Sequence, residues 1–246
     1  WDASAAEKAG YEHFMLKEIH EQPDAIRETI NSHLKLGEKC CFEDLAITKE
    51  YLQSLNKICI VACGTAMHAG LVAKNIIEKL CKIPVDVDIA SEFRYRDPII
   101  DEKTLCIYIS QSGETADTLA ALKLAKTKGC KTLAISNVIG SSITREANFT
   151  IYTHAGPEIA VASTKAYTAQ VSLLAVLAIH FAEILDSYDL AKLEELKTDI
   201  SGLPAKLETV LGSEKLIEEI SQKIYTEHDM YFIGRGTDYY LAMEGS

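Results

Sequence analysis

The stretch Thr104–Lys126, which reads TLCIYISQSGETADTLAALKLAK, decides the fold. Residues 104–109 form an apolar run rich in β-branched and aromatic side chains, which predicts a buried strand. Residues 116–126 carry leucines among their apolar positions and predict a helix. Between them lies the loop Ser110–Thr115, which contains three hydroxyl groups, one amide and one glycine. A strand, a polar loop and a helix in this order form one unit of an α/β fold.

The Ser110–Thr115 loop has the chemistry of a phosphate cradle. A helix start exposes unpaired backbone N–H groups and the positive end of the helix dipole, and a glycine lets the backbone approach an anion closely. The loop contains no Lys or Arg, so it predicts a phosphate monoester held by dipoles and hydroxyl groups. The alternative is an ordinary helix cap, in which Ser112 caps the helix and Thr115 faces water.

The rest of the chain alternates strand and helix about five times. The strands are predicted at 58–62, 85–89, 104–109, 131–136 and 149–152. The helices are predicted at 9–19, 24–30, 67–81, 90–93, 116–126, 141–146 and from Ser163-Thr164 to about 185, with more helix at 190–224. This order predicts an α/β fold, a three-layer doubly wound parallel sheet flanked by helices. In such sheets, ligands bind at the carboxyl ends of the strands, where the strand order reverses.

The composition excludes several classes of protein. The 246 residues are 48% hydrophobic, enough for a full core, and their 25 basic and 36 acidic side chains give a net charge of −11. An acidic chain without a basic block is a poor binder of nucleic acid. Seven cysteines without a C-x-x-C pair argue against disulfides and zinc, and favour reduced thiols in the cytoplasm. No signal peptide or membrane-spanning run is predicted, and residues 171–184 indicate a buried helix.

Two more turns share the form of the Ser110–Thr115 loop. Cys63–Ala66 and Val161–Ser163 each follow a strand and open a predicted helix. Three helix starts that converge are a stronger indication of a phosphate site than one, although three ordinary caps remain the alternative. No Walker sequence G-x-x-x-x-G-K-[ST] is present, and the single glycine of Cys63–Ala66 does not match G-x-G-x-x-G.

Other residues near these turns are weaker candidates for a catalytic or binding role. Cys63 precedes a helix start, where a thiolate is favoured, but His68 lies a turn further on and is not placed to act as its base. Glu158 could orient a substrate hydroxyl. Lys165 could reach toward the pocket, but we interpret it as a solubilising residue on the helix surface. Paired acids for general acid–base catalysis are not apparent, so we assign neither a catalytic residue nor a metal site.

The chain divides into four predicted segments. These are a helical linker (1–53), a first domain that contains the predicted phosphate site (54–190), a helical connector (191–226) and the start of a second domain of the same kind (227–246). The last assignment depends on a repeat, because Gly236-Thr237 matches Gly64-Thr65 at a distance of 172 residues. Asp229–Thr237 therefore predicts another strand and turn. The chain begins at Trp1 and ends inside a predicted helix, so we expect a piece of a longer protein.

Two longer motifs carry a resemblance to a known family. Ser110–Thr118 and Gly156–Lys165 resemble the sugar isomerase (SIS) domain of the glutamine–fructose-6-phosphate aminotransferase family. Trp1-Asp2 and residues 13–19 look like the linker that follows the glutaminase domain of that family. The likeness covers nearly the whole chain, and it matches the first of two SIS domains with a short part of the second.

The resemblance implies an activity and its partners. The family converts fructose 6-phosphate, with ammonia channelled from glutamine, to glucosamine 6-phosphate, and it uses no metal or redox cofactor. The implied partners are these hexose 6-phosphates and a second copy in a homodimer. The acid–base glutamate, Schiff-base lysine and ring-opening histidine of the family would lie beyond Ser246, so this chain is expected to be inactive alone.

The resemblance also assigns sugar-phosphate contacts residue by residue. The phosphate-binding positions of the family fall on Ser110, Gln111, Ser112 and Thr115. Further contacts to the sugar phosphate fall on Thr65, Val161 and Ser163. Ala66 occupies a place where the family usually has serine, which puts one hydroxyl contact in doubt.

Two other functions remain open at this point. The first is a non-catalytic sugar-phosphate sensor, because no acid–base pair is apparent. SIS-containing transcription regulators join the domain to a basic helix-turn-helix, and nothing in this chain is basic in that way. The second is a related SIS deglycase that acts on fructosamine phosphates.

Overall fold

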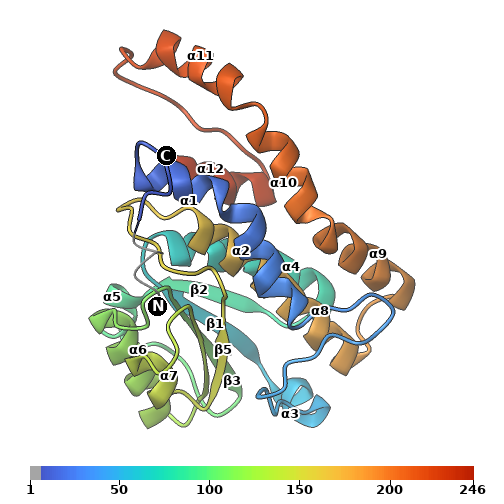
Figure 1. Ribbon diagram of the computed structural model, residues 1–246. Helices are drawn as coiled ribbons and strands as arrows, with labels where there is room; N and C mark the ends of the chain where they lie inside the picture. Colours follow the sequence, from blue (N-terminus) through green and yellow to red (C-terminus); the bar gives the residue numbers. More distant parts are fainter. Residues whose placement is uncertain (1–6) are drawn as a thin grey trace.

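The computed structural model describes residues 7–246, and its centre is a parallel sheet (Figure 1). The strands are β1 (Lys57–Ala62), β2 (Val85–Ile89), β3 (Thr104–Ser110), β4 (Lys131–Ser136) and β5 (Phe149–Tyr152). In the described residues they form one five-stranded sheet in the order β2-β1-β3-β4-β5, with every neighbouring pair parallel. The predicted parallel sheet is confirmed, and the strand at 85–89 lies at its edge.

Helices follow the strands and extend beyond the sheet at both ends of the chain. The first are α1 (Phe14–His20), α2 (Gln22–Asn31), α3 (Lys49–Ser54), α4 (Thr65–Cys81), α5 (Ala90–Phe93) and α6 (Ala116–Thr127). The others are α7 (Ser142–Glu146), α8 (Lys165–Leu185), α9 (Leu190–Ser201), α10 (Leu203–Leu211), α11 (Glu214–Ile224) and α12 (Thr237–Gly245).

The sheet is buried on both faces, because alternate strand residues enter two separate cores. Ile58 and Ile60 of β1 pack in the larger core with α4 and α8. Cys59 and Val61 of the same strand pack in a smaller core with α5, α6 and α7. Successive side chains of a strand point to opposite faces, so this division confirms the predicted three layers. On the outer side of the larger core, α2 packs against α8.

The strand order reverses at β1, which creates a crevice at one end of the sheet. The chain passes from β1 to the edge strand β2 and then returns to β3 on the other side of β1. The carboxyl ends of β1 and β3 lie side by side, with Ala62 paired to Ile109. Since α4 lies on one face and α6 on the other, the loops after these strands diverge. A crevice at such a switch point is where open α/β sheets bind ligands.

Helix α8 corrects one expectation about apolar runs. We expected no run that could span a membrane. By length and composition alone, however, the 21 residues of α8 could cross a bilayer. In the fold, 67% of its most apolar window is buried. The prediction of a buried helix at 171–184 is therefore confirmed.

Two predicted elements differ from the structure. The helix expected from residue 9 begins only at Phe14, because Ala9 and Gly10 both have positive φ angles, 48° and 88°. The strand expected within 229–233 does not form, and this segment is exposed and irregular. The resemblance seen at Trp1-Asp2 lies outside the described residues. The four domain boundaries stay predictions.

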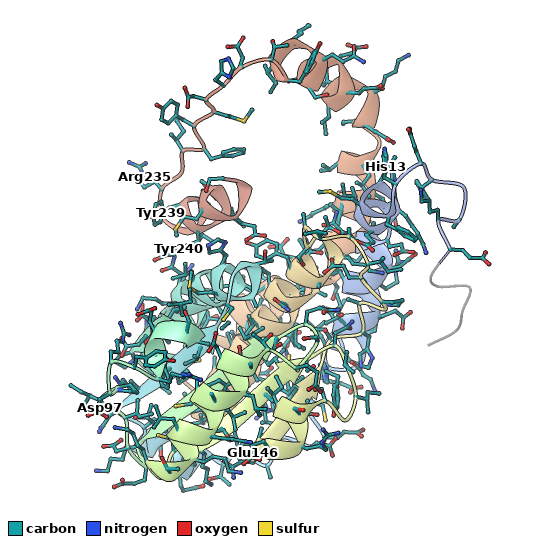
Figure 2. The ribbon with its side chains drawn as sticks, turned by 90° about the vertical axis from the view of Figure 1, so that its left-hand side faces the viewer. His13, Asp97, Glu146, Arg235, Tyr239 and Tyr240 are labelled. Atoms are coloured by element: carbon teal, nitrogen blue, oxygen red, sulfur yellow. The ribbon has the colours of Figure 1, made fainter. Side chains whose placement is uncertain are left out.

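The turn that follows the missing strand nevertheless repeats the first one. Gly64 has φ 54° and ψ −135° at the start of α4, and Gly236 has φ 65° and ψ −128° at the start of α12. Figure 2 shows the segment around α11 arching away from the body of the molecule before α12 returns to α4. In the described residues, 229–233 has no neighbouring strand to pair with, which explains why the turn forms without the strand.

Candidate functional site

One cavity of about 270 Å³ lies at the crevice formed by β1 and β3. All eight predicted site residues line it: Thr65, Ala66, Ser110, Gln111, Ser112, Thr115, Val161 and Ser163. They come from three segments, which are the start of α4, the loop between β3 and α6, and the loop before α8. The structure therefore brings the three predicted turns together, and their role in binding stays a prediction.

The loop between β3 and α6 depends on its glycine. Gly113 has a φ of 66°, and a Cβ atom at this position would lie 2.0 Å from Ser141 Oγ. Its N–H group donates to Ser110 Oγ at 3.1 Å, and its carbonyl accepts from Ile143 N at 3.1 Å. A side chain would therefore push the loop away from α7 and open the cradle.

The hydroxyl groups of this loop are gathered at the start of α6. Ser110 Oγ lies 3.1 Å from Thr115 Oγ1, and Ser112 Oγ accepts from Glu114 N at 3.2 Å. The alternative in which Ser112 caps the helix is wrong, because Thr115 is the N-cap residue and no side chain caps the helix. The first N–H groups of α6 thus begin at the cavity without a side-chain acceptor, which suits an anion.

The one acidic residue of the loop is engaged elsewhere. Glu114 is not among the residues that line the cavity. Its two carboxylate oxygens accept from Ser142 Oγ at 2.6 Å and from Ser142 N at 2.7 Å, at the start of α7. These hydrogen bonds, the hydroxyl one first, lower the pKa of Glu114. The negative charge therefore stabilises α7 instead of opposing an anion in the cradle.

The start of α4 supplies the second open helix terminus. Gly64 is the N-cap residue, and no side chain caps this helix. Thr65 and Ala66 form its first turn and line the cavity. At the second position, Ala66 contributes a methyl group and no hydroxyl to this wall.

The third helix start is not open, which corrects the picture of three equivalent termini. Glu158 Oε1 accepts from Thr164 N at 2.8 Å and from Ala166 N at 3.2 Å, so its carboxylate caps α8. Its Oε2 accepts from Ser163 Oγ at 2.9 Å. Neither Ser163 nor Thr164 caps the helix with its own side chain. Glu158 lines the cavity, but both of its carboxylate oxygens already accept hydrogen bonds from Ser163 and the start of α8.

Lys165 differs most from its predicted role. We expected a solubilising surface residue, but its side chain is only 4% exposed. Its Nζ lies 2.6 Å from Glu21 Oε2, so the buried lysine forms an ion pair with a half-buried carboxylate at the end of α1. The prediction is wrong because the partner lies 144 residues earlier in the chain.

Two polar residues of the cavity wall were missed by reasoning from sequence. Thr118 Oγ1 and Gln170 Oε1 are buried, and neither has a hydrogen-bond partner in the described residues. Thr118 lies one turn after Thr115 on α6, and Gln170 interrupts the apolar run of α8. A buried polar atom without a hydrogen-bond partner lowers the stability of a protein by about 1–3 kcal/mol. A polar ligand in the cavity could supply the hydrogen bonds that these two atoms lack.

The cavity has no cationic side chain among its lining residues. Cys63 is one of these residues, but His68 is directed to another partner, with its Nδ1 2.6 Å from Glu244 Oε2. The described residues therefore offer Cys63 no histidine base. What the wall does offer is two open helix starts and a set of hydroxyl and amide groups, which together can hold an anionic, hydroxylated ligand.

Comparison with known proteins agrees with this geometry. The family model for the SIS domain matches residues 51–180. Over all 246 residues, the chain is 55% identical to glutamine–fructose-6-phosphate aminotransferase (isomerizing) of Clostridium tetani and 56% identical to that of Clostridium perfringens. The chain spans 40% of the length of each of these relatives.

A solved structure is similar over almost the same extent. It is the C-terminal domain of glucosamine-fructose-6-phosphate aminotransferase from Francisella tularensis, at a TM-score of 0.91 and 40% sequence identity. The match covers 97% of this chain and 67% of that chain. Because the SIS family model matches residues 51–180, more than half of the chain, the chain belongs to the SIS-domain family.

Proposed function

We propose that this chain is the sugar-phosphate-binding part of an enzyme that converts fructose 6-phosphate and glutamine to glucosamine 6-phosphate. One observation carries the proposal: the eight residues matched to the family's contacts line a single cavity at the switch point of the sheet. All 246 residues are similar to part of the glutamine–fructose-6-phosphate aminotransferases of two Clostridium species, which supports the choice of substrate.

The phosphate group would lie at the Ser110–Thr115 loop. Its charge would interact with the N–H groups and dipoles at the starts of α4 and α6, since neither helix has a side-chain cap. Hydroxyl groups of Ser110, Ser112 and Thr115 would complete the contacts. The cavity volume of about 270 Å³ suits a small ligand of this kind, being near the lower end of the range for small-molecule sites, roughly 300–1,000 Å³.

The sugar would extend toward the loop before α8. Val161 and Ser163 border this end of the cavity, and Thr65 borders it from α4. Ser163 donates to Glu158, so its hydroxyl oxygen keeps acceptor capacity for a sugar hydroxyl. In this proposal the chain binds the substrate.

Two further properties belong to the same proposal. We expect a homodimer, as the family resemblance implies, and most soluble homo-oligomers are twofold dimers. Sedimentation equilibrium tests this expectation, and a monomer at all concentrations would contradict it. All seven cysteines are free in the structure, which supports the proposed cytoplasmic location because free thiols persist in reducing compartments.

Thermal unfolding with and without ligand tests the proposed function. Fructose 6-phosphate and glucosamine 6-phosphate should raise the melting temperature of the chain, whereas glucosamine should not, because a ligand that binds only the folded state stabilises it. Ser112→Ala should weaken binding of fructose 6-phosphate by about 1–3 kcal/mol. The control is Ser221→Ala on the exposed helix α11. Equal shifts with glucosamine and glucosamine 6-phosphate would contradict the proposal.

A further inference from the structure

The loop before α8 forms the sugar end of the cavity but has little apolar anchoring of its own. It contributes Glu158, Ala160, Val161 and Ser163 to the cavity wall. Val161 is fully exposed, and Ile159 is 45% exposed. Apolar burial therefore does not fix the position of this loop, and its hydrogen bonds must do so.

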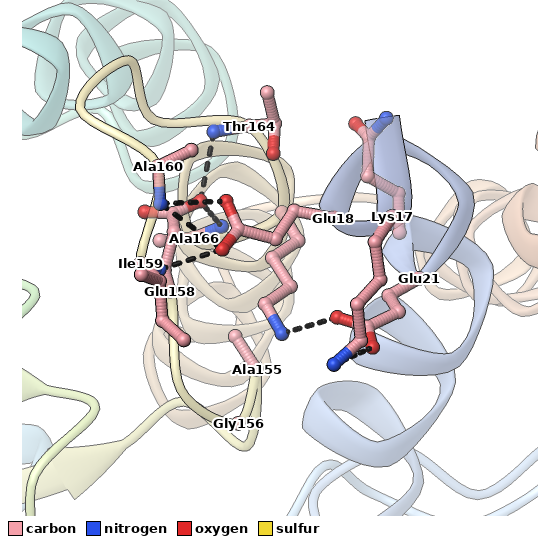
Figure 3. Close-up of polar contacts among 12 residues, drawn as sticks. Lys17, Glu18, Glu21, Ala155, Gly156, Glu158, Ile159, Ala160, Thr164 and Ala166 are labelled. Carbon is pink, nitrogen blue, oxygen red and sulfur yellow. Dashed lines mark hydrogen bonds and ion pairs between the residues drawn. The ribbon is translucent and has the colours of Figure 1, made fainter. Parts of the chain in front are cut away.

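Glu158 ties the C-terminal part of the loop to the start of α8, and Glu18 of α1 supplies hydrogen bonds to its middle. The residue exposure of Glu18 is 2%, and its Oε1 accepts from Ile159 N at 2.6 Å and from Ala160 N at 3.1 Å (Figure 3). A buried carboxylate is costly unless donors surround it, and consecutive backbone N–H groups form a concave site for an anion. The carboxylate and the loop therefore stabilise each other, although they are 141 residues apart in the sequence.

A second contact joins the same helix to the end of the loop. Lys165, the first residue of α8, pairs with Glu21 at 2.6 Å. Lys17 of α1 also lies 3.6 Å from Glu21. Figure 3 shows Glu18 and Glu21 directed from α1 toward the loop and toward α8. Helix α1 thus holds the loop near its middle and at the residue that follows it.

The phosphate end of the cavity is held by different contacts. The carbonyl of Gln111 accepts from Asn137 N at 3.1 Å, and Glu114 accepts from Ser142. The carbonyl of Gly113 accepts from Ile143 N of α7 at 3.1 Å. None of these residues belongs to α1, so a change at Glu18 should alter one end of the cavity and leave the other in place.

We propose that Glu18 is a positioning residue for the sugar end of the cavity, which makes α1 part of the binding site. Its carboxylate holds the 158–163 loop where Val161 and Ser163 meet the sugar, while the phosphate cradle forms without it. The inference rests on the proposed function, because it concerns how the same cavity receives a hexose phosphate.

Two ligands and two variants test this inference by titration calorimetry of the chain. In Glu18→Ala, the affinity for fructose 6-phosphate should fall roughly tenfold to a hundredfold, as expected for lost hydrogen bonds to a charged group. The affinity for inorganic phosphate should not change. Glu18→Gln should be intermediate, because its amide oxygen can still accept from both N–H groups. The matched control is Glu12→Ala, whose side chain is 85% exposed.

The outcomes separate this inference from the function on which it rests. Wild-type binding of fructose 6-phosphate with no loss in Glu18→Ala would overturn the inference alone. An equal loss for both ligands would mean a merely structural role and would also overturn it. Failure of the wild-type chain to bind fructose 6-phosphate would instead overturn the proposed function. If Glu18→Ala does not fold, Glu18→Gln should show faster hydrogen exchange at the Ile159 and Ala160 amides, and unchanged exchange would overturn the inference.

Discussion

Thr118 places a buried hydroxyl in the cavity wall without a hydrogen-bond partner in the described residues. In Thr118→Val, a methyl group replaces that hydroxyl at nearly the same volume. The unliganded protein should become more stable by about 1 kcal/mol, because the cost of an unsatisfied polar group is removed. The affinity for fructose 6-phosphate should fall if the ligand supplies the missing partner. Urea unfolding and titration calorimetry measure the two effects.

Thr127→Val on the exposed end of α6 is the matched control for this prediction. It should change stability by less than about 0.5 kcal/mol and leave affinity unchanged. A Thr118→Val variant that is less stable than wild type, or that binds fructose 6-phosphate equally well, would show that this hydroxyl does not face the ligand.

At the scale of single residues, roles that depend on neighbouring sequence could be predicted. Roles that depend on a contact with a residue far away in the sequence could not. The cavity residues of Cys63–Ala66 and Ser110–Thr115 lie at the ends of β1 and β3. Parallel strands bring their carboxyl ends together, so the proximity of these two segments could be inferred from the sequence. Glu158 and Lys165 were interpreted differently because their roles depend on contacts made by the fold. Nothing near Lys165 in the sequence indicates that Glu21 will bury its charge.

At the scale of elements, the strands were predictable because each is a short apolar or alternating run bounded by turn residues. The strands at 85–89, 131–136 and 149–152 have the predicted bounds. The strand expected within 229–233 shows the limit of such a pattern. A strand must pair with a neighbour to satisfy its backbone groups, and a short apolar run does not reveal whether that neighbour is present.

The contact between Glu114 and α7 predicts a pH dependence of stability. Hydrogen bonds from Ser142 lower the pKa of Glu114 in the folded state below its ordinary value of 4.5. The resulting stabilisation is present above that ordinary value and is lost as the pH falls through the folded-state pKa. Glu114→Gln should therefore lower the melting temperature most at about pH 6–7, with a difference that shrinks toward about pH 3.

The exposed Glu219 of α11 provides the control, because Glu219→Gln should lower the melting temperature little at any pH. A melting-temperature difference between wild type and Glu114→Gln that stays constant from neutral to acid pH would show that the Ser142 contact does not depend on the charge.

At the scale of the whole molecule, the chain spans 40% of the length of its aminotransferase relatives. Within residues 7–246, no Lys or His lines the proposed sugar-phosphate cavity. We therefore expect that the purified chain, given fructose 6-phosphate and ammonia, forms no glucosamine 6-phosphate. A coupled assay for glucosamine 6-phosphate checks this, and measurable turnover would mean that the catalytic groups lie within the chain.

The most direct test of the account is a crystal structure of the chain soaked with fructose 6-phosphate. In the proposed site, helix starts and hydroxyl groups bind the phosphate without a cationic side chain. We expect phosphate oxygens within hydrogen-bond distance of Ser112 and Thr115 and of the first N–H groups of α6. A phosphate bound instead in the larger cavity of about 630 Å³ lined by Lys57, Lys74 and Arg96 would contradict it.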